Sequence, residues 1–454
     1  ILALARRRAS VATTQAADTA QAAIRQLLIL HGDLLANTLR ASEAHASYRA
    51  AMALTTQPLA RAELADRLAL SLFRRGSVQD ALALCEQALA LLATNFSADG
   101  VQMRVQIERT RIRALLAFSR FEEARQICQR ALDLVKPVAL LMPGLADYVR
   151  AYALLVLGYI PRFQGRNQEA RQQLLKCVKH ARAANLREVE ADALIYLSAA
   201  QRDLGDFAGA EANARQALIV AQANENEFQA ANILHFMSVI SYYQDDLVSA
   251  HTRSQQAMAL KQRMGDSTGM VACEIVQALI LAAENQLDEA WRLVQHALTD
   301  SELLESTWLH GLALYVAGVV LTYQGAAPLA ETRLHEALTC DGFYQDQSLR
   351  TGAQTFLGIA YVAQGKLDQA AQVVAAPVAP GTGIDIELMR GLVQGMLHLA
   401  HGEADGVHTV AHQTAQRARE TGYLLYAVEA ERLARLIDTP PLLSQLPRAV
   451  CCRG

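Results

Sequence analysis

The sequence repeats itself with a regular period of about 40 residues, and this repeat constrains the fold more than any other feature. Residues that tolerate the left-handed conformation at the end of a helix recur at this spacing. They are Gly165, Gly205, Asp245, Asn285, Gly325 and Gly365. An alanine follows each turn residue by five positions, and a small residue precedes it by seven. A period of this length is typical of stacked supersecondary units, so we expect one repeat array rather than several unrelated domains.

The residues around each turn predict a helical hairpin. Before Gly205, apolar residues include Leu194 and Leu197, and after it they include Ala210 and Leu218, at the three- and four-residue spacing of a helix. The small residues before and after the turn let the two helices approach closely, and a bulky side chain there would cost about 1–3 kcal/mol. Because one hairpin cannot bury its own apolar face, neighbouring hairpins are expected to stack.

The register extends outward with some drift. Further turns are expected at Gly76, Ser119 and Gly402, and a faint copy lies upstream around Ala44 and Ala51. This gives nine to ten repeats. Prolines and glycines break the register at Val135–Asp147 and at Ala376–Gly383, where we expect surface loops or kinks.

The pattern resembles the tetratricopeptide repeat (TPR) family. The small residues of the family's first helix fall on Gly158, Gly318 and Gly358, and the alanines of its second helix fall on Ala210 and Ala217. The period departs from the family's usual length of about 34 residues, and the signature tryptophan and closing proline are mostly missing. Long-period repeats of this kind are similar to those of MalT-like regulators, where they lie between a signal-transduction ATPase and a DNA-binding domain. The same type of repeat also follows some cyclase and kinase domains.

The resemblance implies an all-α fold, a right-handed α-α superhelix (a TPR-like solenoid) of about nine to ten antiparallel helix pairs. We expect N-terminal helices with a degenerate repeat over residues 1–59, the solenoid over residues 60–420, and a C-terminal capping helix and tail over residues 421–454. Ile1 and the Cys-Cys-Arg-Gly ending suggest a piece of a longer or processed protein.

Composition narrows the class of partner. The formal net charge is −3, which argues against nucleic acid or an anionic membrane as the main partner. No apolar stretch is long enough for a membrane span, and no secretory signal begins the chain. The seven cysteines form no CxxC pair, which favours buried thiols in a reducing, cytoplasmic compartment over disulfides or a zinc ribbon.

No catalytic, metal or cofactor motif stands out. Gly365-Lys366 resembles the end of a phosphate-binding loop but lacks its other residues. The run Arg6–Arg8 is interpreted as a solvated helix end. Four histidines cluster at metal-like spacings, and we interpret them as ordinary helical residues: His398, His401, His408 and His412. The chain is therefore not expected to be an enzyme, and we expect neither metal nor cofactor.

The concave face of the solenoid carries the candidate binding residues. In TPR stacks the first helices line this face. The resemblance places ten residues there: Tyr152, Tyr159, Arg162, Asp192, Arg202, Asn232, His235, Tyr242, Tyr315 and Tyr323. Such side chains offer rigid area and hydrogen bonds to a protein segment, a peptide or a small effector. The alternative is that about half of them only pack between repeats.

The function that follows is a non-catalytic TPR module for protein–protein or effector binding. We expect it to be the regulatory or sensor segment of a larger bacterial signalling or transcriptional regulator. A free-standing scaffold or peptide-binding receptor is the alternative, and an enzyme with a site in the groove is the least favoured. Fold-level analogy alone supports the link to transcription.

Overall fold

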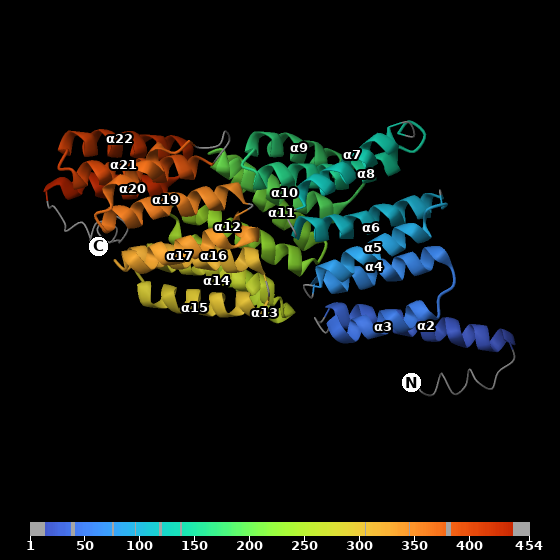
Figure 1. Ribbon diagram of the computed structural model, residues 1–454. Helices are drawn as coiled ribbons and strands as arrows, with labels where there is room; N and C mark the ends of the chain where they lie inside the picture. The colour runs from blue at the N-terminus through green and yellow to red at the C-terminus, as the bar shows by residue number, and fades with distance from the viewer. Residues whose placement is uncertain are drawn as a thin grey trace. The chain divides into compact units, whose positions relative to one another are not determined.

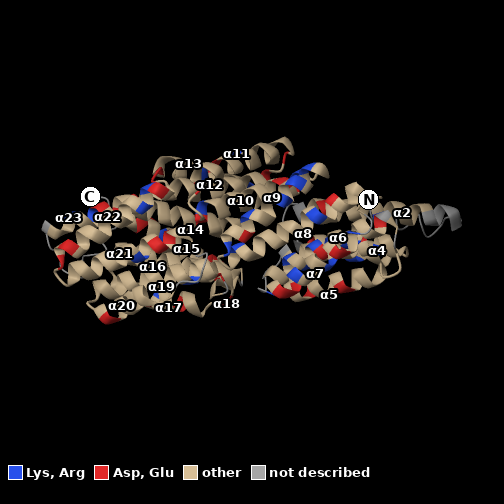
Figure 2. Cartoon of the chain, turned by 90° about the horizontal axis from the view of Figure 1, so that it is seen from above, with Lys and Arg blue, Asp and Glu red and all other residues tan. Residues whose placement is uncertain are grey.

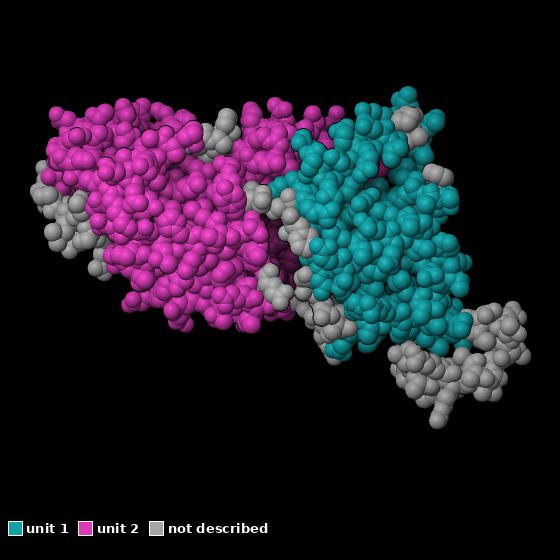
Figure 3. Space-filling view, in the orientation of Figure 1, with its two compact units in different colours: residues 1–145 teal, residues 146–454 magenta. Residues whose placement is uncertain are grey.

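The computed structural model describes residues 14–37, 41–74, 77–95, 97–117, 120–136, 139–304, 306–344, 346–377 and 383–438. Within these ranges all regular secondary structure is helical, which confirms the all-α prediction (Figure 1). The chain divides into two compact units, Ile1–Leu145 and Ala146–Gly454 (Figure 3). Basic and acidic residues are interspersed along the helices of both units (Figure 2).

The first unit contains the helices up to the start of α8. They are α2 (Thr14–Asn37), α3 (Ala41–Ala53), α4 (Pro58–Arg74), α5 (Val78–Leu91), α6 (Ala98–Ala117) and α7 (Phe121–Val135). Consecutive helices pack in pairs, and Ala44 and Ala51 of the faint upstream copy are fully buried in the core of this unit. The turns expected at Gly76 and Ser119 lie outside the described residues.

The second unit contains the regular repeats. Its first helices are α8 (Pro143–Phe163), α10 (Arg187–Asp203), α12 (Glu227–Tyr243), α14 (Ser267–Ala283), α16 (Thr307–Tyr323), α19 (Gln347–Ala363), α21 (Ile384–Ala400) and α23 (Leu424–Arg435). Its second helices are α9 (Asn167–Ala183), α11 (Phe207–Ala223), α13 (Leu247–Met264), α15 (Leu287–Leu303), α17 (Ala327–Thr339), α20 (Leu367–Ala375) and α22 (Ala404–Thr421). The short α18 (Asp341–Tyr344) is inserted before α19, and a 3-10 turn (Leu436–Asp438) follows α23.

The predicted period is visible in the helix boundaries. Helices α10, α12, α14, α16 and α19 have equal lengths, and their first residues recur with the period of the sequence. All six predicted turn residues adopt a positive φ, from 60° at Asp245 to 80° at Gly205. A second series of positive-φ turns links one pair to the next, at Asn185, Glu225 and Gly265. Left-handed residues thus end both helices of the pairs α10–α11 and α12–α13.

Side-chain caps mark the starts of four consecutive helices, α11 to α14. Asp206 accepts a hydrogen bond from the backbone N–H of Gly209, and Asn226 accepts one from that of Gln229. Asp246 and Asp266 make the equivalent contacts one and two helices later. A polar cap at each of these consecutive helix starts satisfies donors that would otherwise be orphaned.

The small-residue columns are the points of closest helix contact. The alanines that follow the turns, from Ala170 to Ala370, are all fully buried. A Cβ atom built on Gly158 would lie 2.5 Å from Cγ of Leu174 in the paired helix, and one on Gly318 would meet Leu334 at the same distance. The expectation that small residues permit this approach is therefore confirmed at these crossings.

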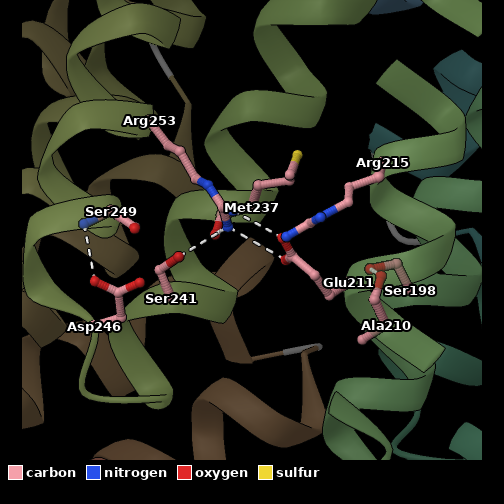
Figure 4. A network of polar contacts seen from close by, with 9 residues as sticks. All are labelled: Ser198, Ala210, Glu211, Arg215, Met237, Ser241, Asp246, Ser249 and Arg253. Carbon is pink, nitrogen blue, oxygen red and sulfur yellow. Dashed lines mark hydrogen bonds and ion pairs between the residues drawn. The ribbon is translucent and has the colours of Figure 1, made fainter. Parts of the chain in front are cut away.

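Polar contacts also join consecutive second helices. Arg253 of α13 donates from Nη2 to Glu211 of α11 at 2.7 Å, and from Nη1 to the Ser241 hydroxyl of α12 at 2.8 Å (Figure 4). Glu211 and Arg253 belong to neighbouring repeats, so their ion pair links one repeat to the next. Their side chains keep only 18% and 20% of their surface exposed, which reduces screening by water.

The expected irregularities occur where prolines and glycines interrupt the register. Helix α20 is short and ends at Ala375, just before the Pro- and Gly-containing stretch, whose residues 378–382 lie outside the described ranges. Pro161 lies inside α8. The repeat around Gly402 forms a complete pair, α21 and α22, with Val407 fully buried in the alanine column.

Two further findings concern cysteines and membranes. Cys85, Cys128, Cys177 and Cys273 are buried free thiols, as predicted, and Cys340 is half-buried. Burial raises the pKa of the Cys85 thiol to about 12, so it stays protonated near neutral pH. None of the described helices combines the length and the apolar character that crossing a bilayer requires. Cys451 and Cys452 lie outside the described residues.

We predict that Gly158→Ala destabilises the protein by about 1–3 kcal/mol, because the new methyl group overlaps Leu174 at the crossing of α8 and α9. Urea denaturation measures the change in unfolding free energy. Gly144→Ala in the same helix is the control, because a Cβ there meets no atom within 4 Å. Equal stability of the two variants would contradict a close-packed crossing.

Candidate functional site

The ten predicted binding residues lie on four first helices of the second unit. Tyr152, Tyr159 and Arg162 are on α8, and Asp192 and Arg202 are on α10. Asn232, His235 and Tyr242 are on α12, and Tyr315 and Tyr323 are on α16. The side chains divide into those that pack within the repeats and those that meet in the interior of the unit.

Two of the predicted residues link neighbouring repeats or helices through hydrogen bonds. Asp192 accepts a hydrogen bond from the Gln229 amide at 2.7 Å. Asn232 accepts one from Lys261 Nζ at 2.6 Å, and Lys261 also pairs with Asp266 at 2.8 Å. These bonds satisfy the polar atoms within the scaffold itself.

His235 has a similar structural setting. Its Nδ1 atom lies 3.6 Å from the Cys273 sulfur on α14, and its ring packs edge-on against Phe236 at 5.7 Å. Burial, together with the charge of Lys261, lowers the pKa of His235 to about 4. The imidazole is therefore neutral at physiological pH and serves packing between α12 and α14.

Three of the tyrosines pack mainly against the scaffold. Tyr242 and Tyr323 are each 8% exposed and belong to hydrophobic clusters of the core. Tyr152 is half-buried and makes an edge-on contact with Tyr148, with ring centroids 5.0 Å apart. These positions contribute area to the repeat stack.

The remaining four predicted residues, Tyr159, Arg162, Arg202 and Tyr315, are half-buried within the second unit. Arg202 and Tyr315 lie within electrostatic range of residues that the sequence patterns did not single out, and we call this set the interior polar cluster: Arg202, Asp203, Tyr243, Tyr315, Asp385, Tyr423 and Tyr426. The cluster draws on α10, α12, α16, α21 and α23. Tyr159 and Arg162 lie beside it, near Asp346 at the start of α19.

The cluster exists because α21 to α23 pack back onto α10 to α12. The Tyr423 hydroxyl donates to the backbone carbonyl of Arg202 at 2.9 Å, across 221 positions of sequence. The Tyr423 ring packs edge-on against Phe207 at 4.8 Å. A Cβ on Gly205 would lie 2.8 Å from Ile384, which shows how closely the turn after α10 approaches α21.

Arg202 and Asp203 form the charged centre of the cluster. Arg202 Nε donates to Asp203 Oδ1 at 2.9 Å, and the two side chains are 12% and 10% exposed. The guanidinium carbon of Arg202 lies 5.5 Å from the centre of the Tyr243 ring, in the geometry of a cation–π contact. The guanidinium of Arg202 is thus committed to partners within the protein.

The tyrosines surround this charge. Tyr243 lies 5.2 Å from Tyr423 and 6.1 Å from Tyr426, measured between ring centroids. Burial raises the pKa of all three phenols well above the usual value, and the negative charge of Asp385 adds to the effect. Each hydroxyl therefore remains a neutral donor and acceptor at physiological pH.

Two more carboxyl groups complete the charge pattern. Burial raises the pKa of Asp385 to about 6, and the nearby negative charge of Asp203 adds to the increase. Burial also raises the pKa of Asp346 to about 6, although its carboxylate accepts backbone N–H bonds from Ser348 and Leu349 at 3.1 Å. The Arg162 guanidinium opposes that increase, and its own buried Nε atom has no hydrogen-bond partner within the described part of the chain.

The sequence analysis set aside a phosphate-loop-like pair and a group of histidines, and the structure shows where these side chains lie. Lys366 Nζ pairs with Glu331 of α17 at 2.6 Å. His398 contacts Glu403 at 2.6 Å, while His401, His408 and His412 are exposed. The basic run Arg6–Arg8 lies outside the described residues.

Elsewhere, ligand atoms of Glu274, His296 and Asp300 lie within 4.8 Å of one another. The 2.9 Å hydrogen bond between His296 Nδ1 and Glu274 accounts for their proximity without a metal ion. This group of three residues was not identified from the sequence.

We predict that Tyr423→Phe lowers the unfolding free energy by about 0.5–1.5 kcal/mol, because it removes the hydrogen bond to the Arg202 carbonyl while keeping the ring. Thermal and urea denaturation measure the loss. Tyr344→Phe is the control, since Tyr344 is 46% exposed. No difference between the two variants would show that the hydrogen bond from Tyr423 to Arg202 contributes no stability.

Comparisons with known proteins find similar solved structures and one matching family model. The solved structures that resemble the chain include a Rap protein complexed with competence and sporulation factor, with 14% identity, a TM-score of 0.46, and coverage of 86% of this chain and 99% of that one. Aspartyl phosphate phosphatase F from Bacillus subtilis has 13% identity, a TM-score of 0.46, and coverage of 83% and 94%.

A third structure is a signal transduction ATPase with numerous domains (STAND) protein with a tetratricopeptide repeat sensor, from Pyrococcus horikoshii. It has 12% identity, a TM-score of 0.40, and coverage of 79% of this chain but only 55% of its own. A search of curated protein sequences finds no match. The sequence model of the MalT-like TPR region matches residues 108–302. This match confirms, over that part of the chain, the resemblance to the MalT-like TPR region that the repeats predict.

Proposed function

We propose that the chain is a non-catalytic binding module, the regulatory or sensor segment of a larger signalling or transcriptional regulator. Its ligand is a peptide, a protein segment or a small effector, and the interior polar cluster is where that ligand binds. The match of residues 108–302 to the MalT-like TPR region supports the assignment to this class of module.

The observation that carries the proposal is the setting of the cluster side chains. Tyr243, Tyr315, Asp385 and Tyr426 are half-buried by surface area, yet burial is the largest cause of the increased pKa of each. Each of these polar side chains therefore keeps some accessible surface for a ligand although protein surrounds it. Convergent polar groups in an otherwise apolar surrounding are typical of ligand sites.

The arrangement of charges supports binding. Asp203 is neutralised by Arg202, and Asp346 caps the first turn of α19. Cluster hydroxyls remain protonated because burial raises the pKa of each tyrosine. The Arg202–Asp203 pair and the protonated hydroxyls offer fixed charges and hydrogen bonds to a ligand.

A ligand at this position contacts helices that are far apart in sequence. Tyr243 belongs to α12, while Asp385 and Tyr426 belong to α21 and α23. Any ligand that touches both sides favours the arrangement in which α23 lies against α10, and it disfavours arrangements in which the two separate. Differential affinity of this kind is what a sensor needs to transmit binding to an attached domain.

We predict that Arg162→Gln and Tyr315→Phe each weaken ligand binding at least ~10-fold, which corresponds to a loss of about 1.4 kcal/mol. A thermal-shift screen of short synthetic peptides, sugars, nucleotides and amino acids identifies ligands of the unmodified chain. Isothermal titration then measures Kd for the variants.

Arg292→Gln is the matched control, because this arginine is 72% exposed on the second helix α15. Melting temperatures separate loss of binding from loss of fold. Unchanged Kd in both cluster variants would place the binding site elsewhere, and the absence of any ligand in the screen would argue against a sensor of small molecules and peptides.

A further inference from the structure

Glu274 of α14 places a charge in a column of the repeat that is otherwise uncharged. It lies eleven residues before the turn residue Asn285. At the same distance before their turns, the other five regular repeats carry Leu154, Leu194, Leu234, Leu314 and Gln354. The Glu274 side chain keeps only 8% of its surface exposed. Because a buried carboxylate is costly to keep and helix packing does not require one here, the exception calls for a function.

The hairpin of α14 and α15 brings two more ligand-type side chains to Glu274. His296 lies eleven residues after Asn285, and an antiparallel pair of helices places residues equally far from their turn at the same level. Asp300 follows His296 by four positions, so both lie on one face of α15. The spacing about the turn explains why three side chains from two helices converge.

The distances among these atoms are close to those around a single metal ion. His296 Nδ1 lies 2.9 Å from Glu274 Oε2 and 3.7 Å from Asp300 Oδ2, and all three ligand atoms are within 4.8 Å of one another. Zinc bonds to nitrogen and oxygen are about 2.0–2.2 Å long, so ligand atoms that share one ion lie about 3.0–3.5 Å apart. A small rotamer change of Asp300, whose side chain is 37% exposed, closes the remaining gap.

No basic side chain competes for the two carboxylates. In the part of the chain that the structure describes, neither Glu274 nor Asp300 forms an ion pair with lysine or arginine. Within the same ranges, no other group of three or more His, Cys, Asp or Glu side chains has converging ligand atoms. His398 and Glu403 share a similar hydrogen bond of 2.6 Å, yet no third ligand joins them among the described residues.

We propose that Glu274, His296 and Asp300 bind a divalent transition-metal ion of the Zn²⁺ type between α14 and α15. An imidazole nitrogen with carboxylate oxygens suits Zn²⁺ better than Mg²⁺ or Ca²⁺, which favour oxygen ligands alone. To coordinate the ion, His296 Nδ1 gives up its hydrogen bond to Glu274, and Nε2 keeps the ring proton. The His296 side chain is 59% exposed, so water completes the coordination shell from the solvent side.

This site uses none of the residues of the interior polar cluster, so it goes beyond the proposed function. Its ligands come from both helices of one hairpin, and an ion bound to all three therefore holds α14 and α15 together. Binding that requires this folded arrangement also stabilises it.

Metal titration of the full chain tests the proposal. The protein is treated with EDTA, the chelator is removed by dialysis under nitrogen, and titration calorimetry measures Kd and stoichiometry near neutral pH. Zn²⁺ should bind with a Kd on the order of micromolar, and Mg²⁺ at least ~100-fold more weakly, because Mg²⁺ keeps its water and prefers oxygen ligands. Equal binding of Zn²⁺ and Mg²⁺ would indicate simple attraction to negative charge and overturn the proposal.

Substitutions assign the ion to these residues. Asp300→Asn removes one carboxylate ligand but keeps the hydrogen bond between His296 and Glu274. It should weaken Zn²⁺ binding at least ~10-fold while leaving the melting temperature of the EDTA-treated protein unchanged. His296→Gln should remove the same equivalent of bound Zn²⁺. The matched control is His398→Gln, which removes a histidine that is hydrogen-bonded to a carboxylate without a third ligand, and it should retain that equivalent.

Thermal stability gives a second readout. Zn²⁺ at about 100 times its Kd should raise the melting temperature of the unmodified chain by at least ~2 °C, and it should raise that of Asp300→Asn by less. Cysteine thiolates also bind Zn²⁺, so the difference between variants, rather than total bound zinc, identifies the site.

Three results would overturn the inference. One is the absence of Zn²⁺ binding at millimolar concentration, and another is an unchanged Kd in both Asp300→Asn and His296→Gln. The third is an equal loss of affinity in His398→Gln, which would place the ion elsewhere. None of these results bears on the ligand screen with Arg162→Gln and Tyr315→Phe, so the proposed function is tested separately.

Discussion

The structure depends on the close approach of two helices within each pair. Fully buried alanines line the second helices, and Gly158 and Gly318 leave no room for a methyl group against the leucines opposite. Close packing at these points fixes the separation of the two helices, so larger apolar residues on either side can bury against the next pair. The repeat period therefore reflects the same close helix crossing recurring from one pair to the next.

The repeat architecture could be predicted because each of its signals is local. Turn residues such as Asp245 and Asn285 adopt the left-handed conformation within a few residues of the helices that they end. Caps such as Asp206 and Asp266 bond to N–H groups three positions later. The short α18 could not be predicted in this way, because it does not follow the repeating columns. The division at Leu145 falls within the register break that the sequence predicts at Val135–Asp147.

The candidate site was only partly accessible to the same reasoning. Repeat columns point to first helices and include Arg202 and Tyr315, two of the residues in the cluster that we propose as the site. The same columns cannot distinguish these residues from Asp192 or Asn232, whose partners lie in the neighbouring helices of the stack. Asp385 and Tyr423 belong to repeats that look degenerate in sequence, and their contacts with α10 depend on how far the whole stack curves. Small rotations at many interfaces determine that curvature, and no single residue encodes it.

The hydrogen bond between Tyr423 and Arg202 affects how cooperatively the helix pairs of the second unit can unfold. In an open solenoid each repeat touches only its neighbours, so unfolding can begin at either end and spread inward. Here the pair α21 and α22 packs against α10 and α11 with four other pairs between them in sequence. This contact joins the two ends of that segment into a ring, in which the loss of an end pair also exposes the interior of a distant one. Closing such a ring costs more loop entropy than pairing neighbouring helices, so we expect this contact, between residues 221 positions apart, to form late in folding.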